Sequence, residues 1–409
     1  MQTISVRCCV VGGGPAGVMV GLLLARSGVD VVVLEKHADF FRDFRGDTIH
    51  PSTLELMHEL GSLDDLLKLP HQKATHVAAQ FGEARTIMAD FDGLKLRCPY
   101  IAFMPQWDFL NFLAGRASRY PTFSIKMEAE ATDIIEVDGR VVGVKAITPR
   151  GPLDVRADLV IAADGRTSLI RDKAGLAVDD LGAPMDVLWF GITRMPTEPD
   201  ETMGRFDAGH MLVEIDRQDY WQCGYVIPKG SLEALRNQGL PAFRANLARL
   251  APFLADRVSE LDSWDKIKLL SVQVNRLRQW HRPGLLCIGD AAHAMSPVGG
   301  VGINLAVQDA VAAANLLAAP LRARVVTARD LAAVQRRRLF PARVTQSLQL
   351  AIQNRVLKPV LAGTGPIKPP FFFHLLRWFP ALRGLTARLI GVGVRPEHIR
   401  ALPYWPEKG

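Results

Sequence analysis

Residues 5–35 read SVRCCVVGGGPAGVMVGLLLARSGVDVVVLE and contain the pattern that decides the fold. The run 5–11 is apolar and β-branched, which is typical of a buried strand. A glycine-rich turn follows, and 18–26 has helical spacing with Gly28 just past its end as a cap. A second apolar run, 29–34, closes the unit. The stretch therefore predicts a strand, turn, helix and strand of Rossmann type.

The glycines of this turn and the acid after the second run predict a dinucleotide site. Gly12 permits the tight turn, Gly14 lets the backbone approach a pyrophosphate, and Gly17 allows the helix to pack closely on the strand. The N-terminus of the helix then points free amides at the phosphates. Glu35 stands 21 residues after Gly14, where its carboxylate can accept both hydroxyls of an adenosine ribose. The alternative is a tight turn without a ligand, and the turn alone does not distinguish FAD from NAD.

A second glycine and acid motif lies in RPGLLCIGDAAHAMSPVGGVGINLAVQDA, residues 282–310, after another apolar strand. This stretch resembles the flavoprotein aromatic hydroxylases, the family of para-hydroxybenzoate hydroxylase and the ubiquinone-biosynthesis hydroxylases. The resemblance implies FAD as the cofactor, with Asp290 on its ribityl chain and Gly289 giving the backbone room. It also implies that a loop lies against the flavin ring. The residues taken from this loop as cofactor contacts are Pro297, Gly302, Ile303 and Asn304.

Three further matches support the same family. LVIAADGRTSLIR, residues 159–171, resembles its DG motif, so Asp164, with Gly165 and Arg171, is expected near the pyrophosphate and the pyridine nucleotide. Asp164 could instead cap a turn. Arg45, in FRGDTIHPSTLELM, and Gln106, in MPQWDFLNFL, fall where members place residues against FAD.

We predict an α/β fold, in which a Rossmann-like FAD-binding domain carries an inserted, mainly antiparallel β-sheet substrate domain and a helical C-terminus. Residues 176–270 lose the alternation of strands and helices and gain strand-like segments, and Asp138-Gly139 marks a hairpin turn. The expected boundaries are 1–75, 97–175 and 271–340 for the FAD-binding domain, 76–96 and 176–270 for the substrate domain, and 341–409 for the C-terminal helical segment.

The resemblance implies an FAD-dependent monooxygenase. NADPH or NADH would reduce FAD transiently, molecular oxygen would form a flavin hydroperoxide, and an aromatic or similar electron-rich small molecule would be hydroxylated. No second GxGxxG unit is present for a nicotinamide domain, and no nucleophile or metal motif is present. Three alternatives stay open: an FAD-dependent reductase of an isoprenoid or other unsaturated substrate, a flavin-dependent halogenase, and a non-enzymatic flavin-binding protein. The halogenase signature WxWxIP would fall on CGYVIP, where Cys223 and Tyr225 replace both tryptophans.

The substrate pocket is expected where the inserted sheet faces the flavin, lined by apolar and aromatic side chains. Because side chains alternate between the two faces of a strand, only about half of the candidates can point inward. The candidates for substrate contact are Trp189, Phe206, Met211 and Trp221, with Phe190 as a further aromatic. His210 and Tyr225 are weak candidates for a catalytic role, since each could orient or deprotonate a hydroxyl.

Composition and charge bound the remaining expectations. The chain has 409 residues with 48% hydrophobic and 22% charged residues, as in soluble globular proteins. Its five scattered cysteines suggest buried structural thiols rather than a redox or metal site. Residues 321–409 carry 16 Lys and Arg against 3 Asp and Glu, which we interpret as a basic outer face on packed helices. We expect a cytoplasmic monomer or homodimer that binds no nucleic acid, with membrane contact possible but not favoured.

Overall fold

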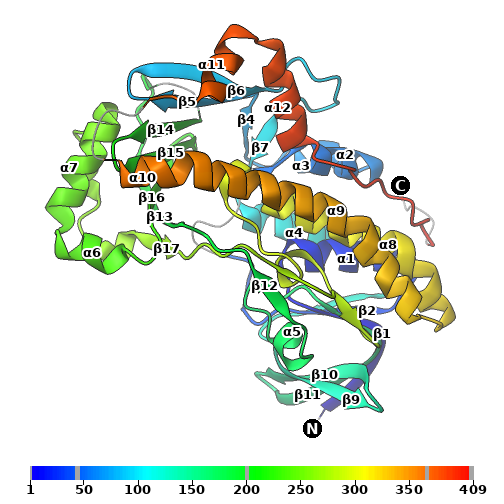
Figure 1. Cartoon of the computed structure of the whole chain (residues 1–409). Coiled ribbons are helices and arrows are strands. Elements are labelled where there is room, and N and C mark those ends of the chain that lie inside the picture. Colours follow the sequence, from blue (N-terminus) through cyan, green and yellow to red (C-terminus); the bar gives the residue numbers. More distant parts are fainter. Residues whose placement is uncertain (1, 42–46, 199–201, 364–367, 405–409) are drawn as a thin grey trace.

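The computed structural model describes residues 2–41, 47–198, 202–363 and 368–404, and it contains two large sheets with helices packed on them (Figure 1). The first sheet has eight strands, of which five run parallel in the order β20, β11, β1, β2 and β8. Buried parallel strands have apolar side chains on both faces, and all four residues of β2 are buried. The bounds of the five are Gln2–Val11 (β1), Val31–Leu34 (β2), Phe123–Lys126 (β8), Gly151–Ala162 (β11) and Leu285–Cys287 (β20).

An antiparallel extension continues this sheet beyond β11. β9 (Glu130–Val137) and β10 (Arg140–Thr148) form a hairpin, and β19 (His281–Arg282) pairs with β20 at the other edge. Asp138 and Gly139 connect β9 to β10 with φ of 48° and 75°. The predicted hairpin turn is therefore confirmed.

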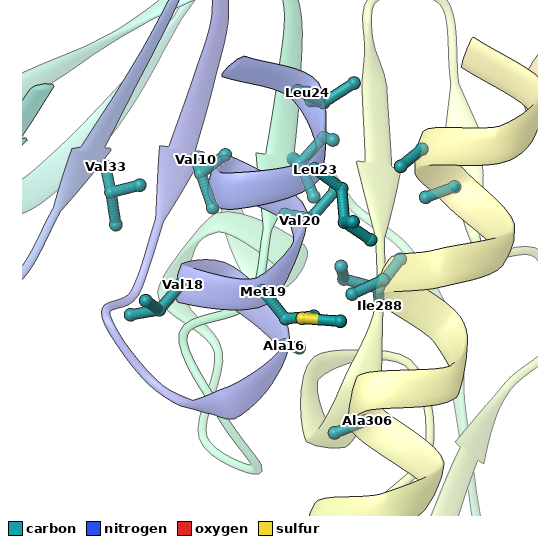
Figure 2. Close-up of a cluster of buried hydrophobic side chains, with 14 of the residues drawn as sticks. Val10, Ala16, Val18, Met19, Val20, Leu23, Leu24, Val33, Ile288 and Ala306 are labelled. Carbon is teal, nitrogen blue, oxygen red and sulfur yellow. The ribbon is translucent and has the colours of Figure 1, made fainter. Parts of the chain in front are cut away.

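Helices α1 and α8 pack on each other beside the first sheet. α1 spans Pro15–Arg26 and α8 spans Gly302–Ala323. In Figure 2, Met19 and Leu23 of α1 point toward Ile288 and the α8 helix. Among the described helices, the segment Val298–Ala323 is long and apolar enough to cross a membrane, but 78% of its most apolar window is buried within the protein. This segment therefore belongs to the core.

The second sheet has seven strands in the order β17, β13, β16, β15, β14, β5 and β6. Its pairings are antiparallel except that between β14 and β5. The predicted antiparallel sheet is therefore present, and 76–90 joins it from a distant part of the sequence. The bounds are His76–Phe81 (β5), Ala84–Asp90 (β6), Met185–Thr193 (β13), Met203–Asp207 (β14), His210–Asp216 (β15), Tyr220–Pro228 (β16) and Lys268–Leu270 (β17).

Short elements connect the two large sheets. A three-stranded sheet orders β3, β7 and β4, and a two-stranded one pairs β12 with β18. The short strands are Thr48–Ile49 (β3), Gln72–Ala74 (β4), Ile101–Phe103 (β7), Val178–Asp180 (β12) and Asn275–Leu277 (β18). The remaining helices before the C-terminal segment are Pro51–Glu59 (α2), Leu63–Leu66 (α3), Gln106–Ala117 (α4), Leu169–Lys173 (α5), Leu232–Asn237 (α6) and Leu240–Leu250 (α7).

The C-terminal segment is helical, as predicted. α9 (Ala328–Ile352) continues through a π-helical turn into α10 (Lys358–Ala362), and together they run from the first sheet to the second (Figure 1). α11 (Phe371–Trp378) and α12 (Ala381–Gly391) follow and contact β6.

Candidate active site

Steric contacts require glycine at two positions of the first turn. Gly12 has φ of +104°, and a Cβ there would lie 2.4 Å from the carbonyl oxygen of Ala163. A Cβ on Gly17 would lie 1.9 Å from the carbonyl oxygen of Gly12. A Cβ on Gly14 would meet nothing within 4 Å, so open space lies at the start of α1. The turn is tight where helix and strand pack and open where a ligand would approach.

The N-terminus of α1 suits a phosphate group. Its first turn contains no acidic residue, and no side chain caps it. The uncapped N-terminus and the helix dipole therefore favour an anion in the space beside Gly14. The pyrophosphate of FAD fits this site.

Glu35 lies beside the same turn at the end of β2. Its Oε2 accepts a hydrogen bond from the amide of Gly13 at 2.9 Å, and its Oε1 accepts one from the amide of His37 at 3.0 Å. These bonds hold a carboxylate at the position expected for an adenosine ribose.

The second motif meets the first in space. Gly289 has φ of +59°, and a Cβ there would lie 3.1 Å from Cβ of Ala16 and 3.3 Å from Cβ of Ala306. The turn is therefore pressed between the starts of α1 and α8. The neighbouring Asp290 lies 3.5 Å from the guanidinium of Arg166, which belongs to the DG motif. Three motifs far apart in the sequence thus converge on one site.

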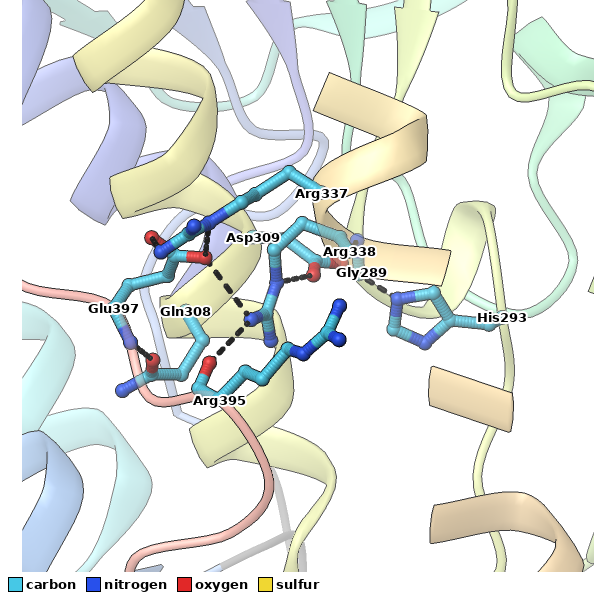
Figure 3. A network of polar contacts seen from close by, with 8 residues as sticks. All are labelled: Gly289, His293, Gln308, Asp309, Arg337, Arg338, Arg395 and Glu397. Atoms are coloured by element: carbon cyan, nitrogen blue, oxygen red, sulfur yellow. Dashed lines mark hydrogen bonds and ion pairs between the residues drawn. The ribbon is translucent and has the colours of Figure 1, made fainter. Parts of the chain in front are cut away.

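A buried polar network holds the second motif in place (Figure 3). Asp309 of α8 is fully buried and accepts hydrogen bonds from the amide of Gly289 at 3.0 Å, Nε2 of His293 at 2.6 Å and Nε of Arg338 at 2.9 Å. Burial raises the pKa of Asp309, but the combined effect of His293 and Arg338 is larger and opposite. The pKa of Asp309 therefore lies below its usual value. Glu397 pairs with Arg338 from the other side. Asp309, Arg338 and Glu397 were not predicted from the sequence as site residues.

The third motif uses its acid within its own turn. Asp164 accepts hydrogen bonds from Oγ of Ser168 at 2.5 Å and from the amide of Ile170 at 3.2 Å. The observed contacts of Asp164 are therefore those of a turn cap, the alternative role stated for it above. Burial raises the pKa of Asp164 despite these hydrogen bonds. Arg171 is buried, and its Nη2 donates to the carbonyl of Arg166 at 3.2 Å, so it also stabilises the turn.

The loop expected against the flavin ring, residues 297–304, forms a 3₁₀ turn and the start of α8, and we call it the flavin loop. Gly302 begins the helix, and a Cβ there would meet nothing within 4 Å. Asn304 is buried, and its Oδ1 accepts hydrogen bonds from the amide of His50 at 2.9 Å and from Oγ1 of Thr53 at 2.7 Å. The Asn304 side chain thus joins α8 to α2, and only its backbone is available to face a cofactor. Pro297 caps the 3₁₀ turn before α8, and Ile303 is buried.

Of the two smaller matches, Arg45 lies outside the described residues. Gln106 is the first residue of α4, and its backbone amide donates a hydrogen bond to Oδ1 of Asp47 at 3.3 Å. Asp47 also pairs with Arg217, which lies between β15 and β16. Burial raises the pKa of Asp47, and Arg217 partly offsets this effect. This buried ion pair joins the segment just before β3 to the second sheet. We did not predict it.

The structure divides the predicted substrate residues between the two faces of the second sheet. Trp189, Phe206 and Met211 pack against the same apolar cluster as Val298 of the flavin loop. Trp221 lies on the other face in a cluster with residues of α7, and its Nε1 donates to Glu198 at 2.7 Å. Phe190 is also on the α7 face. Trp221 and Trp189 therefore cannot line one pocket, because the sheet separates them.

His210 and Tyr225 form a pair, also on the α7 face. Nδ1 of His210 lies 2.5 Å from the hydroxyl of Tyr225, whose ring packs against Phe243 of α7 at 5.1 Å between centroids. Burial lowers the pKa of His210, and it raises the pKa of Tyr225 to about 12. The pair is on the face opposite Trp189 and Val298.

Comparisons with known proteins identify the class that this site defines. A family model described as FAD binding domain matches residues 5–347. The 6-methylpretetramide 4-monooxygenase of Streptomyces rimosus is 33% identical over 387 residues, which cover 93% of this chain and 91% of that protein. The para-nitrophenol 4-monooxygenase of Pseudomonas sp. (strain WBC-3) is 26% identical and covers 81% of this chain and 82% of its own.

A solved structure supports the fold. Anhydrotetracycline hydroxylase OxyS of Streptomyces rimosus superposes with a TM-score of 0.74 at 21% identity, covering 96% of this chain and 77% of that one. The chain belongs to the FAD binding domain family, and it is an FAD-dependent monooxygenase. The resemblance to the aromatic hydroxylases is confirmed.

Proposed function

We propose that this monooxygenase hydroxylates an electron-rich aromatic molecule and uses NADPH or NADH as the reductant. The observation that carries the proposal is the convergence of the two glycine and acid motifs, which approach so closely that a Cβ on Gly289 would lie 3.1 Å from Cβ of Ala16, next to a loop that reaches an apolar sheet face. The names of the relatives agree, since they describe monooxygenases of a pretetramide and a nitrophenol.

The residues at the convergence would hold FAD in defined roles. The amides at the start of α1 would bind the pyrophosphate, Glu35 would bind the adenosine ribose, and Asp290 would bind the ribityl chain. The N-terminus of α8 would place its dipole at the pyrimidine end of the flavin, where it stabilises negative charge. When bound, FAD supplies the reductive activation of oxygen and the transfer of one oxygen atom.

We place the substrate against Trp189 on the sheet face that packs with Val298. The indole Nε1 of Trp189 is buried and has no hydrogen-bond partner among the described residues. Its ring lies on Gly224, where a Cβ would come within 3.0 Å of the indole. A buried donor without a partner costs about 1 to 3 kcal/mol, so a ligand acceptor at this position would gain that energy. The substrate class that fits is a flat aromatic molecule with a carbonyl or phenolic oxygen.

Neither His210 nor Tyr225 acts as a catalytic base in this function, because the sheet lies between them and Trp189. Phe206 and Met211 contribute apolar surface on the substrate face. Orientation and exclusion of water are then the main contributions of this face to the reaction.

The test is NAD(P)H oxidation in air with a panel of phenols, naphthols and polycyclic phenolic ketones. We expect one group of compounds to accelerate oxidation and to gain one oxygen atom by mass spectrometry. Oxidation that no aromatic compound stimulates, with reduction of an unsaturated isoprenoid instead, would favour the reductase. A product formed only with added chloride or bromide would favour the halogenase.

A further inference from the structure

The outer sides of α11 and α12 expose large apolar side chains. We predicted that these helices pack on the core, and Phe373, Leu376 and Ala387 do so. The other apolar residues do not, because the helices contact the protein along one side only. The exposed set comprises Phe371 at 74%, Phe372 at 48%, Trp378 at 64%, Phe379 at 57%, Leu385 at 65% and Leu389 at 37%. We call these six residues the C-terminal apolar surface.

The spacing of Phe371, Trp378, Leu385 and Leu389 places these four on the outward sides of α11 and α12, and Phe379 directly follows α11. On α12, Leu385 and Leu389 are four residues apart, and the buried Ala387 lies between them on the inward side. On α11, Phe371 and Trp378 are seven residues apart, and the buried Phe373 and Leu376 point inward. Both separations return to the same side of an α-helix. In Figure 1, both helices lie at the periphery of the molecule.

Helices α11 and α12 carry charge of one sign, whereas β6, which packs against them, contributes both Arg85 and Asp90. Residues 331–396 contain eleven Lys and Arg and no Asp or Glu. Arg377 and Arg388 are exposed next to the apolar residues, and neither forms an ion pair with any described residue. A second copy of the chain placed on this surface would bring arginines against arginines, which is unfavourable. An anionic lipid surface is complementary to both the charge and the apolar side chains.

We propose that α11 and α12 dock the enzyme on a membrane surface rich in anionic lipid. Phe371, Trp378 and Phe379 would enter the headgroup and acyl boundary, and Arg377 and Arg388 would contact lipid phosphates. The contact is peripheral, since the two helices have 8 and 11 residues. This proposal does not depend on the identity of the substrate.

The test is sedimentation with vesicles of phosphatidylcholine containing 30% phosphatidylglycerol, and with pure phosphatidylcholine, at 150 mM NaCl. We expect wild-type holoenzyme to sediment with the anionic vesicles only. The Arg377→Gln/Arg388→Gln variant should partition about 25-fold more weakly, at about fivefold per arginine. The Trp378→Ser/Phe379→Ser variant should also lose binding.

The matched control is Val325→Ser/Leu402→Ser, which removes apolar residues that are 61% and 77% exposed outside this surface. It should bind like wild type. All variants should keep the FAD absorbance of wild type, which shows that they are folded. Wild-type protein that stays in the supernatant, or variants that all bind equally, would overturn the proposal. A dimer in light scattering that only the Trp378→Ser/Phe379→Ser variant loses would also overturn it, in favour of a second copy of the chain.

Discussion

Nε of Arg338 donates a hydrogen bond to Oδ1 of Asp309 at 2.9 Å, and both side chains are almost completely buried. Asp309 uses its other oxygen to hold the amide of Gly289, so the ion pair supports the turn that carries Asp290. Arg338→Met should lower the free energy of unfolding by about 3 kcal/mol, because it leaves a buried carboxylate with fewer partners. Urea unfolding followed by circular dichroism measures this change.

Arg337→Met is the matched control, since Arg337 is the neighbouring residue and its side chain is 44% exposed. Its ion pair with Glu397 should contribute about 1 kcal/mol or less. Equal destabilisation by the two substitutions would contradict the role of the buried pair.

Asp290→Ala tests the second motif. Loss of a charge-assisted hydrogen bond to a ribityl hydroxyl should weaken FAD binding by about 1.5 to 3 kcal/mol. FAD titration of the apoprotein, followed by flavin fluorescence, measures the affinity. Asp64→Ala, at an exposed acid on α3, should leave the affinity unchanged. If Asp290→Ala binds FAD as wild type does, the motif has been assigned to the wrong function.

The buried His50 should make the free energy of unfolding decrease in acid. Burial lowers its pKa to about 4, so the folded protein keeps it neutral while the unfolded chain binds a proton below about 6.5. The contribution of neutral His50 to the free energy of unfolding is therefore fully present above about pH 6.5 and is lost as the pH falls toward 4. Nδ1 of His50 lies 2.9 Å from the carbonyl of Ile390, and asparagine can replace this hydrogen bond.

Wild type should consequently lose about 2 kcal/mol more than His50→Asn between pH 7.5 and pH 5. Urea unfolding at the two pH values measures the difference. Parallel losses in the two proteins would show that another group governs the acid sensitivity.

Trp189→Phe tests the proposed substrate contact. It keeps an aromatic ring on Gly224 but removes the indole N–H, so the Kd of an oxygen-bearing substrate should rise about tenfold. Perturbation of the flavin spectrum during substrate titration measures the Kd. Trp221→Phe, on the α7 face, should leave the Kd unchanged, and an analogue without the oxygen should bind both proteins equally. An unchanged Kd in Trp189→Phe would refute this contact.

The local patterns of the sequence predicted much of the fold. The glycine turn, the hairpin at Asp138-Gly139 and the second antiparallel sheet all follow from short-range spacing. Just before α2, which starts at Pro51, Thr48 and Ile49 pair with β7. Such long-range pairing is not encoded in local periodicity.

The site residues that escaped prediction depend on tertiary contacts. Which face of a strand meets the flavin loop depends on how the sheet docks, so the sequence could not separate Trp189 from Trp221. A buried role for Asp309 could have been predicted from the sequence, since an acid within the apolar run GINLAVQDAVAAA must be paired when it is buried. Its partner Arg338 is 29 residues away, and Glu397, which pairs with Arg338 in turn, is 88 residues away, so neither could be inferred.

In the function we propose, the enzyme inserts one atom of molecular oxygen into an aromatic ring at the site between the two motifs and the Trp189 face. The most direct measurement is turnover under ¹⁸O₂ with NADPH and the best substrate from the phenol panel, followed by mass spectrometry of the product. We predict a product two mass units heavier than the one formed under ¹⁶O₂, with about one NADPH consumed per product. A hydroxylated product without ¹⁸O, or substrate reduction that proceeds without oxygen, would rule out this function.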